Sequence, residues 1–143
     1  MIEVKHLYKS FEDKKVLKDI NIVFEDGKTN LIIGQSGAGK TVLMRCVTGL
    51  IHPTKGEVLY DGRNFVNLKK RQQVLMRREM GMIFQSAALF DSQTVLENVR
   101  FPLDMFSTMT PKERQKRALE CLDRVNLTGA EQKFPGEISG GMQ

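Results

Sequence analysis

Residues 29–50 have the sequence TNLIIGQSGAGKTVLMRCVTGL, and the order of residue types within this stretch predicts the fold. Residues 31–33 form an apolar run that is too short and too β-branched for a helix, which indicates a buried strand. An apolar helical pattern begins at Val42 and stops at Gly49. A strand, a glycine-rich loop and a helix in this order are the setting that a phosphate-binding loop requires.

The loop between this strand and this helix has the complete pattern G-x-x-x-x-G-K-T, made up of Gly34, Gln35, Ser36, Gly37, Ala38, Gly39, Lys40 and Thr41. Glycines let a backbone approach a phosphate closely, and the positive end of the following helix attracts its negative charge. We expect Lys40 to contact the β- and γ-phosphates of a nucleoside triphosphate and the Thr41 hydroxyl to ligate Mg²⁺. The structural alternative is an ordinary glycine turn, and the flanking strand and helix argue against it.

The composition is that of a globular chain with 143 residues, 41% hydrophobic content and a net charge of +5. Two basic clusters, residues 69–78 and 112–117, have helix-like surroundings and are expected to be solvated helix faces. No aromatic residues alternate with these charges, so no specific nucleic acid partner is expected. Cys46 and Cys121 lie in apolar helical patterns and are expected to be reduced. No apolar run approaches the ~20 residues of a membrane span.

The N-terminal half contains further strand patterns at residues 2–7, 16–24 and 57–60, which predict a small antiparallel sheet. Asp26-Gly27 indicates a hairpin turn that leads directly into the strand of the phosphate loop. Residues 68–76 predict a basic amphipathic helix, and residues 80–84, with the sequence MGMIF, predict a second buried strand.

The C-terminal half contains two capping-box patterns, which begin at Thr94 and Thr110 and each predict the start of a helix. Pro102 is expected to end or kink the first of these helices. The second helix carries an apolar stripe that is expected to face the core, made up of Ala118, Cys121, Leu122 and Val125.

The last six residues, 138–143, have the sequence ISGGMQ and closely resemble the LSGGQ signature of ATP-binding cassette (ABC) ATPases. Together with the phosphate loop, this signature extends the resemblance over the whole chain. Residues 83–99, with the sequence IFQSAALFDSQTVLENV, look most like the Mla/Mce-type ATPases that serve phospholipid trafficking. The resemblance therefore implies the ATP-binding subunit of a membrane transporter, and the likeness to Mla/Mce-type ATPases implies lipids as the cargo.

The resemblance also assigns roles to single residues. Phe11 occupies the position where the family has an aromatic residue that stacks on adenine; Tyr8 is the rival, and a core role at a strand end is the structural alternative. Gln85 matches the family's mobile glutamine, which ligates Mg²⁺ or holds the attacking water; the alternative is a polar residue that ends a buried strand.

The signature residues Ser139, Gly140 and Gly141 serve, in the family, the ATP site of the opposite subunit. The resemblance therefore implies a head-to-tail dimer with a second nucleotide-binding chain. Residues 86–99 are implied to meet a transmembrane permease, with ordinary packing of Leu89 and Phe90 as the alternative. Such a subunit is expected in the cytoplasm, peripheral to the inner face of the cell membrane.

The resemblance implies an α/β fold: a P-loop (RecA-like) nucleotide-binding core with an N-terminal antiparallel β-subdomain and part of a helical subdomain. Residues 1–85 would form the β-subdomain and the phosphate-loop core, and residues 86–143 the helical subdomain. The family's catalytic carboxylate and switch histidine find no match among these residues, so we expect a truncated domain that binds ATP without hydrolysing it. Two alternatives remain: a soluble ABC ATPase of translation or repair, and a catalytically silent module that associates on ATP binding.

Overall fold

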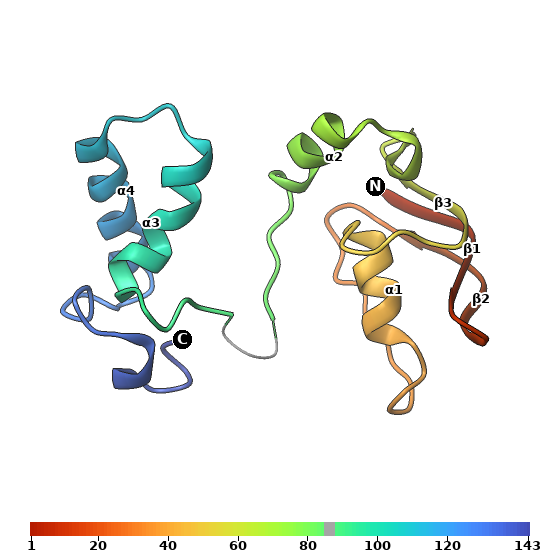
Figure 1. Ribbon diagram of the computed structural model, residues 1–143, viewed down its shortest axis with the longest axis horizontal. Coiled ribbons are helices and arrows are strands. Elements are labelled where there is room, and N and C mark those ends of the chain that lie inside the picture. The colour runs from red at the N-terminus through yellow and green to blue at the C-terminus, as the bar shows by residue number, and fades with distance from the viewer. Residues whose placement is uncertain (85–87) are drawn as a thin grey trace. The chain divides into compact units, whose positions relative to one another are not determined.

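The computed structural model describes residues 1–84 and 88–143, so Gln85 lies outside the described residues. The chain divides into two compact units, unit 1 with residues 1–81 and unit 2 with residues 82–143. Unit 1 contains an antiparallel sheet and the helices α1 and α2, whereas unit 2 contains the helices α3 and α4 (Figure 1).

The sheet of unit 1 has the strand order β2-β1-β3-β4, and every pairing is antiparallel. The strands are β1 (Ile2–Phe11), β2 (Lys14–Phe24), β3 (Lys55–Tyr60) and β4 (Arg63–Asn64). Ile2 lies opposite Phe24 on one side and Tyr60 on the other, so the first strand occupies the middle of the sheet. The three strands predicted from the alternating patterns are all present, and β1 and β2 extend beyond their predicted bounds.

The β1–β2 pairing is interrupted by residues in left-handed conformations, His6 at φ 47° and Asp19 at φ 52°. Side chains satisfy the polar groups there: the His6 N–H donates to Asn21 Oδ1 over 2.8 Å, and His6 Nδ1 lies 2.8 Å from Asp19 Oδ1. The hydrogen bond with His6 keeps the pKa of Asp19 below its usual value. Side chains therefore replace the ladder hydrogen bonds that are missing where the β1–β2 pairing is interrupted.

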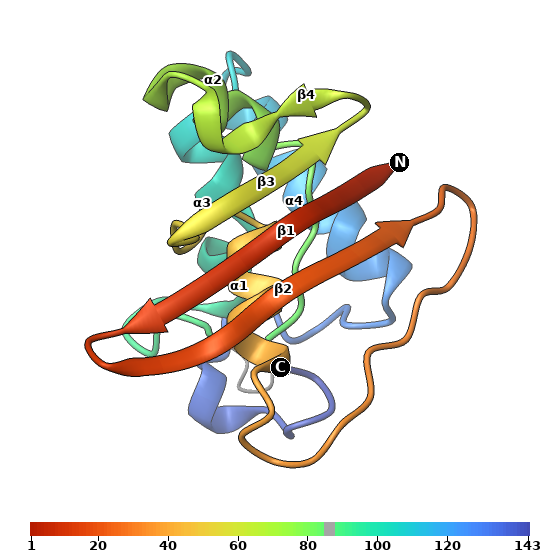
Figure 2. The same ribbon diagram turned by 90° about the vertical axis from the view of Figure 1, so that its right-hand side faces the viewer.

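The core of unit 1 lies between the sheet and α1 (Lys40–Val47), which runs behind the strands in Figure 2. Leu43, Cys46 and Val47 of the helix share this core with buried residues of β1 and β3, and Cys46 is a free thiol. The Tyr60 hydroxyl donates to the backbone oxygen of Val47, and burial raises the pKa of Tyr60 to about 12. These contacts hold the helix that follows the phosphate loop against the sheet.

Two predicted buried strands are absent, and both predictions are wrong. Residues 31–33 and 80–84 form no strand, and no strand among the described residues pairs with them. Leu31 and Ile33 are each 81% exposed, and Ile83 is 99% exposed. An apolar run becomes a buried strand only beside neighbours that satisfy its backbone groups and cover its faces. The predicted hairpin after Asp26-Gly27 is wrong for the same reason.

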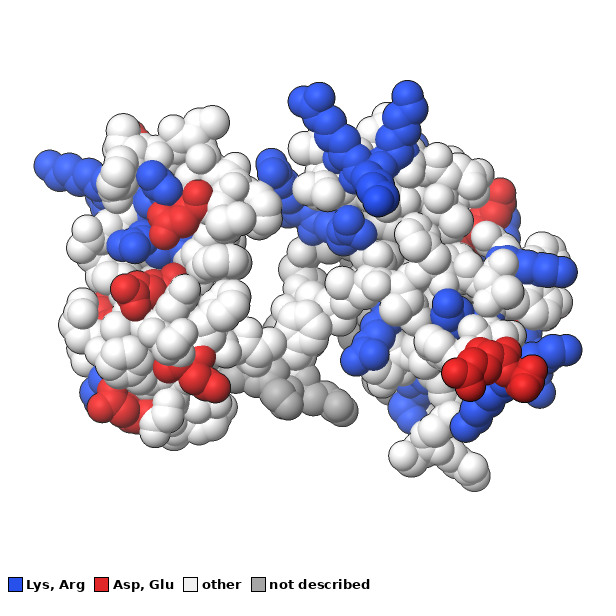
Figure 3. Space-filling model, viewed as in Figure 1, with Lys and Arg blue, Asp and Glu red and all other residues white. Residues whose placement is uncertain are grey.

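Helix α2 (Lys70–Arg77) confirms the predicted basic helix of unit 1, and Lys and Arg side chains protrude over it in Figure 3. Lys69, Lys70 and Arg71 are exposed, as expected for a solvated face. Arg77 instead donates to the backbone oxygen of Gly49 over 3.0 Å and lies 5.8 Å from the ring centre of Phe65, in η1 (Phe65–Asn67). This arginine therefore has a structural role.

Unit 2 consists of α3 (Val95–Phe106), α4 (Pro111–Arg124) and the short η2 (Pro135–Glu137), packed around Leu96, Ala118 and Leu122. Both predicted capping boxes are present, at Thr94 and at Thr110. Of the predicted end or kink at Pro102, the structure excludes the end, because α3 continues for another turn beyond it. Val125, predicted to face the core, is instead 61% exposed because α4 ends before it.

In the part of the chain that the structure describes, no helix has both the length and the apolar character that crossing a membrane requires.

Candidate phosphate-binding site

The loop from Gly34 to Thr41 leads directly into the first turn of α1. Gly37 at φ 79° and Gly39 at φ 94° have left-handed conformations, which glycine adopts at little cost. The Ala38 N–H donates to the Gln35 oxygen over 3.2 Å, so the loop closes through a turn of its own. The helical ladder begins with the bond from the Leu43 N–H to the Gly39 oxygen, 2.8 Å.

Gly39 is held close to strand β2. A Cβ added at this position would lie 3.1 Å from Leu17 Cδ2 and 3.2 Å from Val16 Cγ1. These distances are tight for a carbon contact, and a side chain here would be strained in any case by the positive φ. The side chains of Val16 and Leu17 therefore leave little room for any residue but glycine at position 39 of the phosphate loop. The sequence pattern of the loop alone does not indicate this role.

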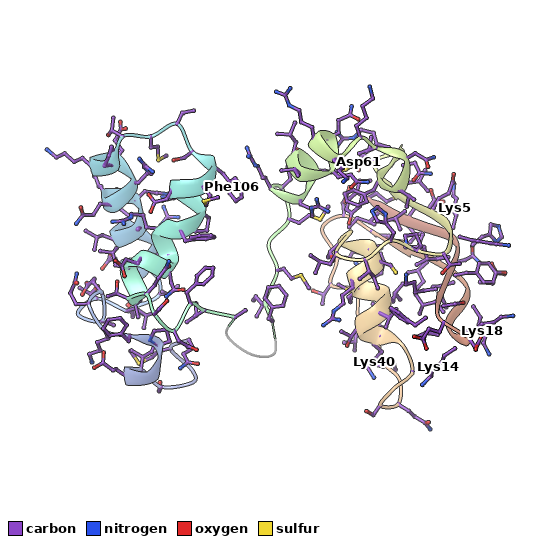
Figure 4. All side chains as sticks on the ribbon, in the orientation of Figure 1. Lys5, Lys14, Lys18, Lys40, Asp61 and Phe106 are labelled. Carbon is purple, nitrogen blue, oxygen red and sulfur yellow. The ribbon has the colours of Figure 1, made fainter. Side chains whose placement is uncertain are left out.

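Lys40 extends its side chain back over the loop, at the N-terminal end of α1 (Figure 4). Its Nζ donates to the oxygen of Gly34 over 2.7 Å and to that of Gln35 over 2.8 Å. The first N–H groups of an α-helix have no acceptor within the helix, so those of Lys40, Thr41 and Val42 are available to an anion. An ammonium group and the N-terminal N–H groups of a helix thus belong to the same loop and helix start, as phosphate binding requires.

The donors near the loop also fit a magnesium ion that arrives with a nucleotide. Thr41 is exposed in the first turn of α1, where its hydroxyl can be one oxygen ligand. Residues 1–84 and 88–143 contain no group of three His, Cys, Asp or Glu side chains that could hold a metal by themselves. Phosphate oxygens of the nucleotide, together with water, would therefore supply most of the remaining ligands.

Phe11 ends β1, and its side chain is 46% exposed. The Nζ of Lys9 lies 4.9 Å from the centre of the Phe11 ring and donates to the backbone oxygen of His52 over 2.8 Å. One face of the ring is therefore covered by a tethered cation, an arrangement that the sequence reasoning missed. Residues two apart in a strand share a face, so the spacing of Lys9 and Phe11 could have indicated it. Tyr8 is also exposed, at 37%.

The signature residues lie in unit 2. Ser139, Gly140 and Gly141 are exposed, while Ile138 just before them is 9% exposed and belongs to the core. The Ser139 oxygen accepts the N–H groups of Met142 at 2.9 Å and Gln143 at 3.2 Å, as in the first turn of a helix. The core thus anchors a segment that presents a hydroxyl and glycine N–H groups to solvent.

The described part of residues 86–99 is organised by one asparagine. The Asn98 side chain accepts from the N–H of Phe90 and donates to the backbone oxygens of Phe90, Gln93 and Thr94. Phe90 remains 47% exposed although its ring lies 4.8 Å from that of Phe101, centre to centre. Phe90 therefore packs against Phe101 and is also partly exposed to solvent.

Comparison with known proteins adds to this picture. The family described as ABC transporter matches residues 17–143. The chain is 37% identical over 142 residues to the probable ribonucleotide transport ATP-binding protein mkl of Mycobacterium leprae, covering 99% of this chain and 41% of that protein. It is 39% identical over 143 residues to the methionine import ATP-binding protein MetN of Legionella pneumophila, covering 100% of this chain and 42% of that protein. The chain thus spans about two fifths of the length of these curated relatives.

Among solved structures, the chain is similar to the dimeric structure of MJ0796, a bacterial ABC transporter cassette. The TM-score is 0.87 at 33% sequence identity, and the match covers 99% of this chain and 65% of that chain. A second structure of the same cassette, in a post-hydrolysis state bound to ADP and Pi, matches with a TM-score of 0.85. The α/β fold expected from the resemblance is confirmed, with the antiparallel sheet and helices that the structure describes.

Proposed function

The chain belongs to the ABC transporter family, and on that basis we propose that it is the ATP-binding part of a subunit that powers a membrane transporter. The observation that carries the proposal is the phosphate loop, where the Lys40 ammonium lies against the loop oxygens at the N-terminal end of α1. The ADP-bound relative supports the choice of an adenine nucleotide. We assign residues 1–85 to the β-subdomain with the phosphate loop, and residues 86–143 to the helical subdomain.

In this proposal the β- and γ-phosphates occupy the loop and take over the Lys40 ammonium from the oxygens of Gly34 and Gln35. That exchange replaces two neutral acceptors with charged ones, which bind an ammonium more strongly. The Thr41 hydroxyl ligates Mg²⁺, and Gln85, outside the described residues, is proposed as a second ligand. Adenine stacks on the ring face of Phe11 that Lys9 leaves uncovered, and stacking of this kind contributes about 1–3 kcal/mol.

A second copy of the nucleotide-binding chain completes the site in the proposal. Ser139, Gly140 and Gly141 are exposed and rich in hydrogen-bond donors, which suits an anion clamp for the γ-phosphate bound by the partner. The dimeric state of the MJ0796 cassette supports this head-to-tail arrangement. The catalytic carboxylate by which the family activates water finds no match among residues 1–143. These residues on their own are therefore expected to bind ATP and not to hydrolyse it.

The partner in the membrane is proposed to be a permease subunit that contacts residues 86–99, with the exposed ring of Phe90 as one contact. This places the chain in the cytoplasm against the inner face of the membrane. The cargo named for the relatives differs, being ribonucleotides for mkl and methionine for MetN. Our proposal of a lipid cargo rests on the resemblance of residues 83–99 to Mla/Mce-type ATPases.

The proposal is tested by calorimetric titration of Mg-ATP into the chain and into Lys40→Ala. We expect saturable binding that becomes at least about tenfold weaker in the variant, a loss of about 1.4 kcal/mol or more. Lys70→Ala, which removes an exposed lysine of α2 in the same unit, is the matched control and should bind as the parent does. Equal affinities for Lys40→Ala and the parent would contradict the proposal. Copurification of the full-length protein with a permease then separates a transporter subunit from a soluble ABC ATPase.

A further inference from the structure

A groove lies in unit 1, and no residue of the phosphate loop lines it. It has a volume of about 580 Å³ and is lined by residues of β1, β2 and β3 and the segment before β3. Lys15, Lys18 and Lys55 supply three ammonium groups, and Ser10 and Thr54 supply hydroxyls. Tyr8 forms an aromatic wall and Leu17 an apolar one, and no carboxylate is among the lining residues. Figure 2 shows the three strands that contribute to it, and Figure 4 labels Lys18.

The three lysines of this groove have no acidic partner at ion-pair distance among the described residues. Among residues 1–84 and 88–143, none of Lys15, Lys18 and Lys55 forms an ion pair with an Asp or Glu side chain. Lys5 on the same sheet, in contrast, lies 3.1 Å from Glu3. Three like charges around one groove repel one another and produce a positive potential there, which an anion relieves.

The hydroxyl donors are held in place by the backbone. Thr54 Oγ1 accepts the N–H of Ser10 over 3.0 Å, and the Thr54 N–H donates to the oxygen of Tyr8 over 2.8 Å. Because the Thr54 oxygen is already an acceptor, its proton is the group left to donate. The nearby carboxylate of Asp19 is already engaged by His6, Asn21 and Tyr8. The groove therefore offers donors and positive charge, and its lining includes no competing acidic group.

We propose that this groove binds a phosphoryl dianion, either of a soluble phosphorylated compound or of a lipid headgroup. Its volume is that of a small-molecule site. The phosphate loop, Phe11 and the signature residues do not line it, so the groove differs from the site proposed for ATP. Two of its lining residues also bear on that site, because Leu17 lies against Gly39 and Tyr8 is the alternative to Phe11 for adenine.

The test follows backbone amide resonances of the ¹⁵N-labelled chain while inorganic pyrophosphate is added. The titration is carried out on Lys40→Ala as well as on the parent, so that binding at the phosphate loop is recognised. We expect saturable shifts at Ser10, Thr54 and Lys55 with a Kd on the order of 1 mM. The double variant Lys18→Gln, Lys55→Gln should weaken that Kd at least about tenfold. The matched double variant Lys5→Gln, Lys14→Gln should leave it unchanged.

A second arm identifies the source of the phosphoryl group. The chain is sedimented with phosphatidylcholine vesicles that contain or lack phosphatidic acid. Cosedimentation that requires phosphatidic acid and is lost in Lys18→Gln, Lys55→Gln assigns the groove to a lipid headgroup, whereas pyrophosphate binding alone assigns it to a soluble compound. Shifts confined to residues 34–41, equal affinity in both double variants, or no saturable response in either arm would overturn the proposal. The spectral dispersion of β1 and β3 amides verifies folding of each variant.

Discussion

Gly56 shows how strongly one residue can restrict the sheet. Its φ is +96°, and a Cβ added there would lie 2.2 Å from the oxygen of His6 and 2.7 Å from Cα of Leu7. Backbone atoms cannot move aside as a flexible side chain can, so the close approach of β3 to the interrupted part of β1 requires glycine.

We predict that Gly56→Ala destabilises the chain by about 2–5 kcal/mol, since overpacking costs about 1–3 kcal/mol and a left-handed alanine about 1–2 kcal/mol. Gly62→Ala is the matched control, because φ there is +76° and no atom lies within 4 Å of the added carbon. It should show only the conformational cost of about 1–2 kcal/mol. Urea unfolding followed by circular dichroism measures both, and equal losses would refute the steric argument.

At the scale of elements, α3 and α4 are joined by a carboxylate with two arginine partners. Asp104 Oδ2 lies 2.8 Å from Arg100 Nε on the same helix, and Asp104 Oδ1 lies 2.8 Å from a terminal nitrogen of Arg114 on α4. The hydrogen bond from Arg100, with the charges of both arginines, holds the pKa of Asp104 below its usual value. The ion pair between Arg100 and Asp104 joins residues on either side of Pro102. This ion pair and the hydrogen bond from the Ser107 N–H to the Leu103 oxygen together support the helical turn beyond the proline.

A carboxyl whose pKa is lowered by folding stabilises the folded state above its ordinary pKa, and this contribution disappears as the pH falls through the folded-state value. We therefore predict that Asp104→Asn lowers the melting temperature at pH 7, and that the difference from the parent shrinks as the pH falls below about 3.9. Thermal melts at a series of pH values provide the measurement. Asp91→Asn, at an exposed turn of unit 2, should leave the melting temperature nearly unchanged. A melting-temperature difference between Asp104→Asn and the parent that persists undiminished at low pH would contradict a stabilising role for the ionised Asp104 carboxylate.

At the scale of the whole molecule, the two apolar runs that form no strand contain the three most exposed large hydrophobic residues among those that the structure describes. Leu31, Ile33 and Ile83 are more than four-fifths exposed, and Phe84 is 49% exposed. Exposed apolar segments of high β-propensity with unpaired backbone groups promote association between chains. The family relatives are longer than this chain, which covers 65% of the MJ0796 cassette.

We expect the chain to associate in a concentration-dependent manner, and the double variant Ile33→Lys, Ile83→Lys to shift it toward monomer. The added charges make burial of these runs between chains unfavourable. Val23→Lys, at an apolar position of β2 that is 48% exposed, controls for a gain of positive charge. Sedimentation velocity over a range of concentrations is the measurement. A monomeric parent, or equal association of the parent and the double variant, would show that these runs are not the contact.

Features that depend on neighbours in the sequence could be predicted from the sequence. Such features are the alternation in β1 to β3, the capping boxes at Thr94 and Thr110, and the glycine loop before α1. Each is encoded by side chains within a few residues of one another, so local geometry determines the outcome. The family assignment followed from the same local patterns, at residues 34–41 and 138–143.

Features that depend on distant partners were decided by the tertiary structure. Residues 31–33 and 80–84 have the composition of buried strands, but a strand requires a neighbour that no local pattern supplies. The cation on Phe11 depends on the tether from Lys9 to His52, and the shape of the phosphate loop depends on Val16 and Leu17 of another strand. A short pattern specifies which conformation a segment favours, whereas pairing, burial and charge at a site depend on the residues that folding brings beside it.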